Sequence, residues 1–354
     1  MNATYSNRLS RRLLQSVFKN QWVVPRKPSP VAHGVFKFVE NVIARPRPKS
    51  QTVDRPIFIM SLPRSGSSML QDLLSAHDGL GYITNMMHLF WPCHCGADMV
   101  RRWLNLNVEG ERFLKDSVMV QGGTPSDPVA AWNDWYDQDP DNLEFQPTTP
   151  EMLGEERIRR MQLQIQKLLW CFRSSGDVRF LCKNPGLIAY MELTAKLFPD
   201  AKFIYLIRDP RKNANSMRKL YRLCEEQRAN ISWKPPELVP YPRFPRLGEY
   251  ISTYGADSLE TTARLWRDAS IAMKPWEDSP QVHTIRFEDL LASPQEKISE
   301  IMNFCELSPE GAENDTFRER LGKVGVVSHR NPSYDGFERI EEICSDEMKR
   351  WGYA

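Results

Sequence analysis

The sequence predicts an α/β fold in which one mostly parallel sheet carries helices on both faces, with helical insertions. Short apolar runs alternate with amphipathic segments from residue 55 onward. One run, KFIYLI at 202–207, is apolar without alternation, which is typical of a strand buried on both faces. Strands that alternate with helices pair in parallel, because each helix carries the chain back across the sheet.

The first predicted unit is a strand, a tight polar loop and a helix. PIFIM at 56–60 is the strand, and LPRSGSS at 62–68 is the loop. Apolar residues then recur at helical spacing, at Met69, Leu70, Leu73 and Leu74. This order of elements makes the predicted sheet P-loop-like.

The remaining elements continue the alternation of strands and helices. Residues 93–150 are mixed, with acidic and proline breaks, and we expect a helical insertion at about 90–155 that walls a substrate pocket. The later patterns predict helices at 154–175, at 186–198, from near Lys212 and at 294–305, and strands at 179–182, 202–207 and 282–286.

Residues 1–50 are predicted to be an N-terminal extension and linker, and residues 51–354 a single domain. The first 50 residues are basic and end in the proline-rich run ARPRPKS. Within them, four apolar residues recur at helical spacing, namely Leu13, Leu14, Val17 and Phe18. This pattern fits either a helix that packs on the domain or a helix that docks on a membrane surface or a partner.

The composition argues against several classes of protein. The formal net charge is only +2, so bulk charge predicts no nucleic-acid partner. No run approaches the roughly 18–20 apolar residues that a transmembrane helix needs. Seven cysteines are an odd number for a disulfide framework, and Cys93-His94-Cys95 has no second Cys/His pair at zinc-ligand spacing. We therefore expect a cytoplasmic protein without a metal site, whose oligomeric state the sequence does not decide.

The loop LPRSGSS has the features of an anion site. A strand that turns into a helix points several backbone N–H groups at one spot, and the helix dipole favours negative charge there. Gly66 permits a close approach of the backbone, and Arg64 adds a forked cation. Hydroxyl donors are available from Ser65, Ser67 and Ser68.

The same loop argues against a magnesium-dependent kinase or ATPase. A nucleotide-triphosphate loop ends in Gly-Lys-Ser/Thr, which places a lysine on the phosphates and a hydroxyl on magnesium. Here the corresponding run is Ser-Gly-Ser-Ser, and the cation stands before the glycine.

A second anion motif follows the strand at 202–207. The segment IYLIRDPRKNANSM places Arg208 at the carboxyl end of that strand and Ser216 in the next helix. Ligands of open α/β sheets bind at this edge. An arginine fork and a hydroxyl suit a phosphate group, so the two motifs together fit a nucleotide phosphorylated at two places.

In order and spacing, these two motifs resemble those of the sulfotransferases that use 3′-phosphoadenosine 5′-phosphosulfate (PAPS). The segments FLCKNPGLIAYMELTAKLFPDAKF, IRFEDLLASP and SHRNPSYDGFERI are similar to blocks of bacterial and tyrosylprotein sulfotransferases, over roughly residues 55–352. The resemblance implies that residues 64–68 hold the 5′-phosphosulfate and that Arg208 and Ser216 hold the 3′-phosphate. Lys323 and Arg330 are possible further contacts to the 3′-phosphate, although their spacing departs from the family pattern.

The resemblance also implies catalytic roles. Lys183, in Cys-Lys-Asn-Pro, matches a lysine that faces the sulfuryl group, and Arg64 shares its work of neutralising the leaving group. The family usually carries a glutamate or histidine as the base, but the offset of the glutamate falls here at Thr84-Asn85. His88 is the nearest titratable side chain and is our predicted base, with Glu144 as the alternative.

We therefore expect an enzyme that transfers a sulfuryl group from PAPS to a hydroxyl, or an amine, of a small-molecule or lipid-like acceptor. Adenosine 3′,5′-bisphosphate would leave, and no metal would take part. Two alternatives remain open, a P-loop-like nucleotide-dependent kinase and a non-catalytic nucleotide-binding module.

A histidine at the end of the first helix, His77, is expected to be structural. The candidates for the lining of an acceptor pocket are aromatic, namely Trp91, Trp132, Trp135 and Tyr136.

Overall fold

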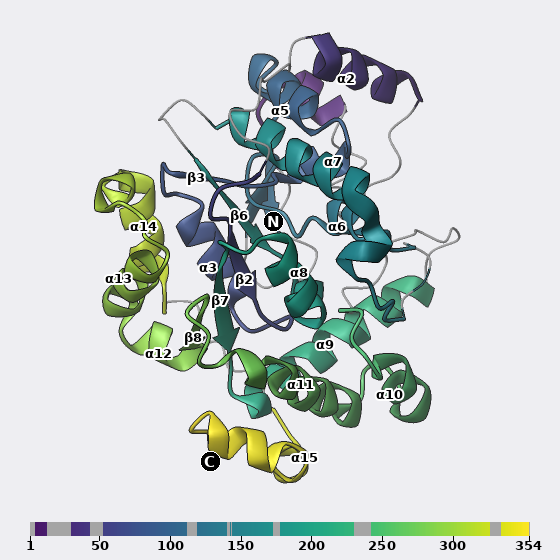
Figure 1. The fold of residues 1–354 in the computed structure, drawn as a ribbon, viewed down its shortest axis with the longest axis vertical. Helices are drawn as coiled ribbons and strands as arrows, with labels where there is room; N and C mark the ends of the chain where they lie inside the picture. Colours follow the sequence, from purple (N-terminus) through teal and green to yellow (C-terminus); the bar gives the residue numbers. More distant parts are fainter. Residues whose placement is uncertain are drawn as a thin grey trace.

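In a computed structural model, five strands form one parallel sheet at the centre of the molecule (Figure 1). The structure describes residues 4–12, 30–42, 52–111, 119–139, 142, 144–172, 178–229, 242–325 and 334–353. Across the sheet the strands run in the order β3 (Leu80–Gly81), β6 (Arg179–Lys183), β2 (Ile57–Met60), β7 (Lys202–Ile207) and β8 (Val282–Arg286). Each neighbouring pair is parallel. The predicted parallel sheet is confirmed.

Alternate residues of the strands pack into two separate apolar clusters, one on each face. Phe58, Phe180 and Phe203 belong to the larger cluster, whereas Ile57 and Ile204 belong to the smaller one. Successive side chains of a strand point to opposite faces of the sheet, so both sets can be apolar only when both faces of the sheet are covered. This explains why these strands have continuous apolar sequences.

Helices cover both faces of the sheet (Figure 1). The smaller cluster is closed by α3 (Ser67–Leu74), α12 (Phe287–Ala292), α13 (Pro294–Phe304) and α14 (Asp315–Lys323). The larger cluster is closed by α6 (Val129–Trp135), α7 (Pro150–Trp170), α8 (Met191–Leu197), α9 (Pro210–Ala229), α11 (Leu259–Met273) and α15 (Phe337–Arg350).

One predicted helix has two parts in the structure. The segment expected at 186–198 is a 3₁₀ helix, η2 (Pro185–Tyr190), followed directly by α8. The side chain of Asn184 accepts a hydrogen bond from the backbone N–H of Gly186 and so starts the 3₁₀ turn directly after β6. Short 3₁₀ helices also occur at η3 (Lys274–Trp276) and η4 (Pro309–Ala312).

The predicted insertion is partly helical and partly a small antiparallel sheet. It contains α5 (His94–Trp103) and α6, but also β4 (Val108–Glu111) and β5 (Met119–Gln121). β1 (Thr4–Tyr5) adds to β4 as a third strand. The first residues of the chain therefore contact the insertion, a contact that the sequence did not predict. α2 (Pro30–Val42) packs against α5.

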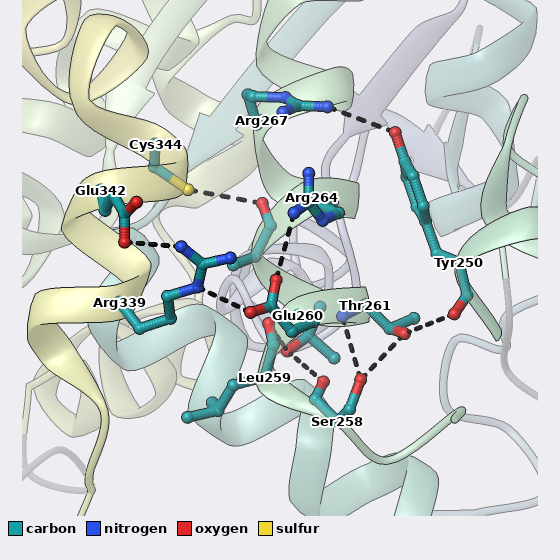
Figure 2. Close-up of polar contacts among 12 residues, drawn as sticks. Tyr250, Ser258, Leu259, Glu260, Thr261, Arg264, Arg267, Arg339, Glu342 and Cys344 are labelled. Atoms are coloured by element: carbon teal, nitrogen blue, oxygen red, sulfur yellow. Dashed lines mark hydrogen bonds and ion pairs between the residues drawn. The ribbon is translucent and has the colours of Figure 1, made fainter. Parts of the chain in front are cut away.

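The C-terminal helix α15 is fixed to α11 by polar contacts (Figure 2). Nε of Arg339 donates to Glu260 at 2.6 Å, and Arg264 donates to the same carboxylate at 3.3 Å. Ser258 caps α11 by accepting from the N–H of Thr261. α10 (Leu247–Tyr254) joins this cluster through Tyr250.

None of the helices in the described part of the chain is both long and apolar enough to cross a lipid bilayer.

Candidate functional site

The loop between β2 and α3 lies at the carboxyl end of the sheet and requires glycine at position 66. Gly66 has φ 92° and immediately precedes the first residue of α3. A Cβ atom at this position would lie 2.2 Å from Cε2 of Phe287. The loop therefore needs glycine both for its left-handed conformation and for its contact with the Phe287 ring.

The two predicted anion motifs meet in space. β2 and β7 are neighbours in the sheet, so the loop after β2 lies next to the turn after β7. Nε of Arg64 donates to Oγ of Ser216 at 3.0 Å, and Nη1 of Arg208 donates to the backbone oxygen of Arg64 at 2.8 Å. The expected proximity of the motifs is confirmed by these contacts.

Arg208 is a half-buried cation whose Nε donor lies out of reach of solvent. Its Nε atom is buried without a hydrogen-bond partner among the described residues, and burial lowers the pKa of its guanidinium. The guanidinium carbon lies 5.0 Å from the centroid of the Phe287 ring. A buried donor of this kind is costly unless an acceptor reaches it. An anion at this position would complete the hydrogen bonds of the guanidinium.

The C-terminal residues hold the turn that carries Arg208. Nε1 of Trp266 donates to the backbone oxygen of Arg208 at 2.9 Å. The phenol of Tyr353 donates to Glu288 at 3.0 Å, and the other carboxylate oxygen of Glu288 accepts from the N–H of Asp209. This is how α11 and the residues after α15 fix the position of the strand end.

Asn213 supports the loop of residues 62–68 from α9, a role that the sequence analysis missed. Its Nδ2 atom donates to the backbone oxygen of Pro63 and to Oγ of Ser65, both at 3.1 Å. The side chain is fully buried. Asn213 lies three residues before Ser216 in the same KNANS run, and residues at this spacing share one face of a helix. This spacing was the sequence signal that could have identified Asn213.

Lys183 ends β6, beside β2, and lies close to the same loop. Its register partner is Ile59, and its Nζ atom donates to Oγ of Ser68 at 3.1 Å. It also forms an ion pair with Asp127, a residue that the sequence analysis did not select. The lysine side chain is almost fully buried, whereas that of Asp127 is 45% exposed. Lys183 thus connects the loop to the insertion.

His88 lies in α4 (Asn85–Leu89), next to the segment that carries Asp127. Its Nδ1 is 2.7 Å from Oγ of Ser126, and its Nε2 accepts from the N–H of Ala130 at 3.4 Å. Burial lowers the pKa of the imidazole to about 4. The ring is therefore neutral near pH 7, with its Nδ1 proton directed at Ser126.

The other candidate residues lie in different surroundings. Glu144 is exposed and lies against Gly248 in α10. Nε2 of His77 is 2.9 Å from the backbone oxygen of Ser308, and its Nδ1 accepts from the N–H of Gly79, which fits the expected structural role. The exposed Lys323 ends α14 and pairs with Glu319 at 2.5 Å. Arg330 lies outside the described residues.

Three of the four aromatic residues considered for an acceptor pocket are core residues. Trp132, Trp135 and Tyr136 are buried in the larger apolar cluster, where the ring of Trp132 meets that of Phe58 at 6.0 Å. Trp91 is half-buried and packs edge-on against Trp135.

A second polar cluster, away from the loop, contains Glu40, His94 and Cys95 within 4.8 Å of one another. The ring nitrogens of His94 lie 2.9 Å from the backbone oxygen of Pro92 and 3.0 Å from that of Gln164. A metal ligand needs a nitrogen lone pair with room for the ion, and carbonyl oxygens at these distances leave no such room. This cluster fits a structural role.

Comparison with known proteins identifies the family. The family model described as "Sulfotransferase family" matches residues 56–310, most of the chain. No curated protein matches the chain. Among solved structures, sulfotransferase STF1 from Mycobacterium tuberculosis H37Rv is 14% identical, with 88% of this chain and 81% of that chain covered and a TM-score of 0.49.

Two further solved structures are also similar to this chain, with lower TM-scores. Sulfotransferase STF9 from Mycobacterium avium is 14% identical, with 98% of this chain and 86% of that chain covered and a TM-score of 0.47. A retinol dehydratase in complex with androsterone and the inactive cofactor PAP is 12% identical, with 99% and 97% covered and a TM-score of 0.35. Because these values are low, the assignment depends on the family match, which spans Arg64, Lys183 and Arg208. The chain is a member of the sulfotransferase family.

Proposed function

We propose that this enzyme transfers the sulfuryl group of PAPS to a hydroxyl, or an amine, of a small-molecule or lipid-like acceptor, by in-line displacement without a metal. The observation that carries the proposal is the junction of the two anion motifs. Arg64 contacts Ser216, and Arg208 contacts the backbone of Arg64, so one ligand can contact both arginines. A nucleotide with phosphates on both its 3′ and 5′ positions has the matching charges.

In this proposal residues 64–68 bind the 5′-phosphosulfate. The left-handed Gly66 and the start of α3 direct backbone N–H groups at the anion. Asn213 keeps the loop in place through its bonds to Pro63 and Ser65. Hydroxyls for further hydrogen bonds come from Ser65, Ser67 and Ser68.

Arg208 and Ser216 bind the 3′-phosphate. The buried Nε of Arg208 has no hydrogen-bond partner in the part of the chain that the structure describes, and a phosphate oxygen would complete its hydrogen bonds, which supports this role. Lys323 is proposed only as a weaker contact, since it pairs with Glu319 on the surface of α14. Arg330 keeps its proposed role without structural support.

Lys183 neutralises the charge that develops on the bridging oxygen as the sulfur–oxygen bond breaks. Its contact with Ser68 supports this role, since the lysine reaches the loop that binds the transferred group. Its low exposure matters because a charge in a water-poor site stabilises a transition state more than one in solvent. Arg64 supplies a second cation to the same anion.

The insertion at about 90–155 would form one wall of the acceptor site, because its residue Asp127 reaches Lys183. The described part of the chain contains seven cysteines and no disulfide, which supports a reducing, cytoplasmic location. A kinase is disfavoured because the loop has no Gly-Lys-Ser/Thr run for magnesium and a triphosphate.

Transfer of ³⁵S-sulfate from PAPS to a library of hydroxyl compounds tests this proposal. The library should contain phenols, sterols, long-chain alcohols and a tyrosine peptide, and each reaction should include a metal chelator. We expect labelled product with at least one acceptor class and its loss in Lys183→Met. Donor binding without transfer to any acceptor would favour a non-catalytic binding module, and ATP-magnesium-dependent phosphorylation would favour a kinase.

A further inference from the structure

An acceptor hydroxyl must lose its proton as it attacks sulfur, and a positioned side chain normally takes that proton. We propose that Asp127 takes it, and that binding of the donor releases Asp127 from its ion pair with Lys183. The inference rests on the proposed function and adds the identity and the control of the base.

Asp127 is held in place by contacts between two segments, 83–88 and 122–128. The N–H of Asn85 donates to the oxygen of Thr124 at 3.0 Å, and the N–H of Ser126 donates to the oxygen of Ile83 at 2.9 Å. Thr84 forms an isolated bridge with Pro125. The carboxylate next in the chain is therefore fixed beside the carboxyl end of β6, where Lys183 lies.

The two members of the ion pair differ in their access to solvent. The side chain of Lys183 is 3% exposed and that of Asp127 is 45% exposed. A buried ammonium requires a counter-ion, and Asp127 provides it in the structure described. The exposed fraction of Asp127 leaves room for an acceptor molecule to approach its carboxylate.

Donor binding would change the partner of Lys183. The phosphosulfate brings negative charge to the loop that holds Ser68, and Nζ of Lys183 already reaches that residue. The anion therefore competes with Asp127 for the same ammonium. Once Lys183 pairs with the donor, Asp127 is a carboxylate released from its ion pair, next to the group to be transferred, and its oxygens are available to accept the proton of the acceptor hydroxyl.

With Asp127 as the base, each bond that forms or breaks and the transferred proton are accounted for. The acceptor oxygen forms a bond to sulfur, and the bond between sulfur and the bridging oxygen breaks, leaving its electron pair on adenosine 3′,5′-bisphosphate. The acceptor proton passes to a carboxylate oxygen of Asp127, which returns it to solvent after the sulfated product departs. Lys183 stabilises the oxygen that gains charge.

His88 fits a positioning role better than the role of base. Its Nδ1 proton is directed at Ser126, and its Nε2 already accepts from the N–H of Ala130. A ring with a pKa of about 4 also has little affinity for a proton at neutral pH. His88 therefore holds the residues on both sides of Asp127.

Calorimetric titration with PAPS and with adenosine 3′,5′-bisphosphate tests the exchange of partners without any acceptor. In Asp127→Asn the donor no longer competes with a carboxylate, so we expect PAPS to bind about 3- to 10-fold more tightly than to wild type. Adenosine 3′,5′-bisphosphate, which lacks the sulfuryl group, should change less. Unchanged or weaker PAPS binding would contradict the exchange.

The transfer rate tests the role of base. Asp127→Asn should lower kcat by about 100-fold or more at saturating donor, whereas Asp127→Glu should restore part of the rate. Asp137→Asn is the matched control and should keep the wild-type rate, because Asp137 lies in the same insertion and pairs with Arg157 at 2.7 Å. A kcat for Asp127→Asn within about 3-fold of wild type would overturn the assignment.

His88→Gln separates the two candidate bases. A smaller loss of kcat than in Asp127→Asn supports Asp127 as the base, and a larger loss would return that role to His88.

Failure of this inference differs from failure of the proposed function, because a wild-type protein with no transfer activity would fail the acceptor assay. The PAPS titration would still decide whether Asp127 and the donor compete for Lys183.

Discussion

Nε of Arg64 donates a hydrogen bond to Oγ of Ser216 at 3.0 Å, and so joins two motifs that lie 152 residues apart in the sequence. The contact exists because β2 and β7 are neighbouring parallel strands whose carboxyl ends meet at one edge of the sheet. A ligand at this edge therefore contacts the loop before α3 and the start of α9 together.

Gly66→Ala should abolish donor binding and destabilise the fold. The new Cβ atom would lie 2.2 Å from Cε2 of Phe287, and the residue has φ 92°. The control is Gly255→Ala, at φ 87° and ψ 152° with no atom of a described residue within 4 Å of the new Cβ, which should cost about 1–3 kcal/mol through backbone strain alone. Denaturant unfolding and calorimetry check both variants. If the two variants bind adenosine 3′,5′-bisphosphate equally well, the packing of Phe287 on the loop does not matter.

Asn213→Ala should weaken binding of adenosine 3′,5′-bisphosphate by about 10-fold, because the loop loses two hydrogen bonds from α9. Asn215→Ala is the matched control, since Asn215 is a buried asparagine of the same helix that donates to the backbone oxygens of Arg211 and Asp335. Both variants should lose a similar amount of stability. Equal nucleotide affinity in the two would show that Asn213 supports the helix and not the loop.

Acid should destabilise the protein partly through His88. Burial lowers the pKa of this ring from 6.5 to about 4, so between these pH values the unfolded chain binds a proton that the folded protein does not. The free energy of unfolding should therefore fall by about 3 kcal/mol from this residue as the pH drops from 6.5 to 4. Denaturant unfolding across this range should show a shallower pH dependence in His88→Gln. Parallel curves would contradict the buried, neutral ring.

Deletion of residues 2–12 should destabilise the small sheet without affecting nucleotide binding. Thr4 and Tyr5 pair with β4, and Oγ of Ser6 donates to the backbone oxygen of Asn107 at 3.0 Å. Hydrogen exchange should become faster at residues 105–109 in the truncated protein. No change in exchange would show that residues 4–12 do not stabilise the small sheet.

The sheet could be predicted because its strands are buried on both faces. Strands β7 and β8 have the predicted bounds, because β7 is an apolar run between polar turns and the β-branched residues of β8 (VHTIR) are typical of a strand. β3 has only two residues, Leu80 and Gly81, and no sequence period is detectable over that length. β4 and β5 were also missed, because the third strand of their sheet comes from residues 4–5, about a hundred positions earlier.

The candidate site was predictable where its residues follow strands directly. Arg64, Lys183 and Arg208 stand at or just after the ends of β2, β6 and β7. Because the carboxyl ends of parallel strands lie at one edge of the sheet, the order of strands and helices predicts that these three residues lie at that edge. Asp127 stands in an irregular segment, and its approach to Lys183 depends on the pairing of 83–88 with 122–128. Phe287 was missed because only the packed structure brings its ring against Gly66.

The most direct test of the central claim is a titration of the enzyme with adenosine 3′,5′-bisphosphate in the presence of a metal chelator. The account predicts one binding site per chain, with affinity lowered at least about 10-fold in both Arg64→Ala and Arg208→Ala. Arg222→Ala should bind normally, since Arg222 lies further along α9 and pairs with Asp257 at 3.0 Å. Affinity that is unchanged when either motif arginine is removed, or binding of ATP with magnesium in place of the bisphosphate, would contradict it.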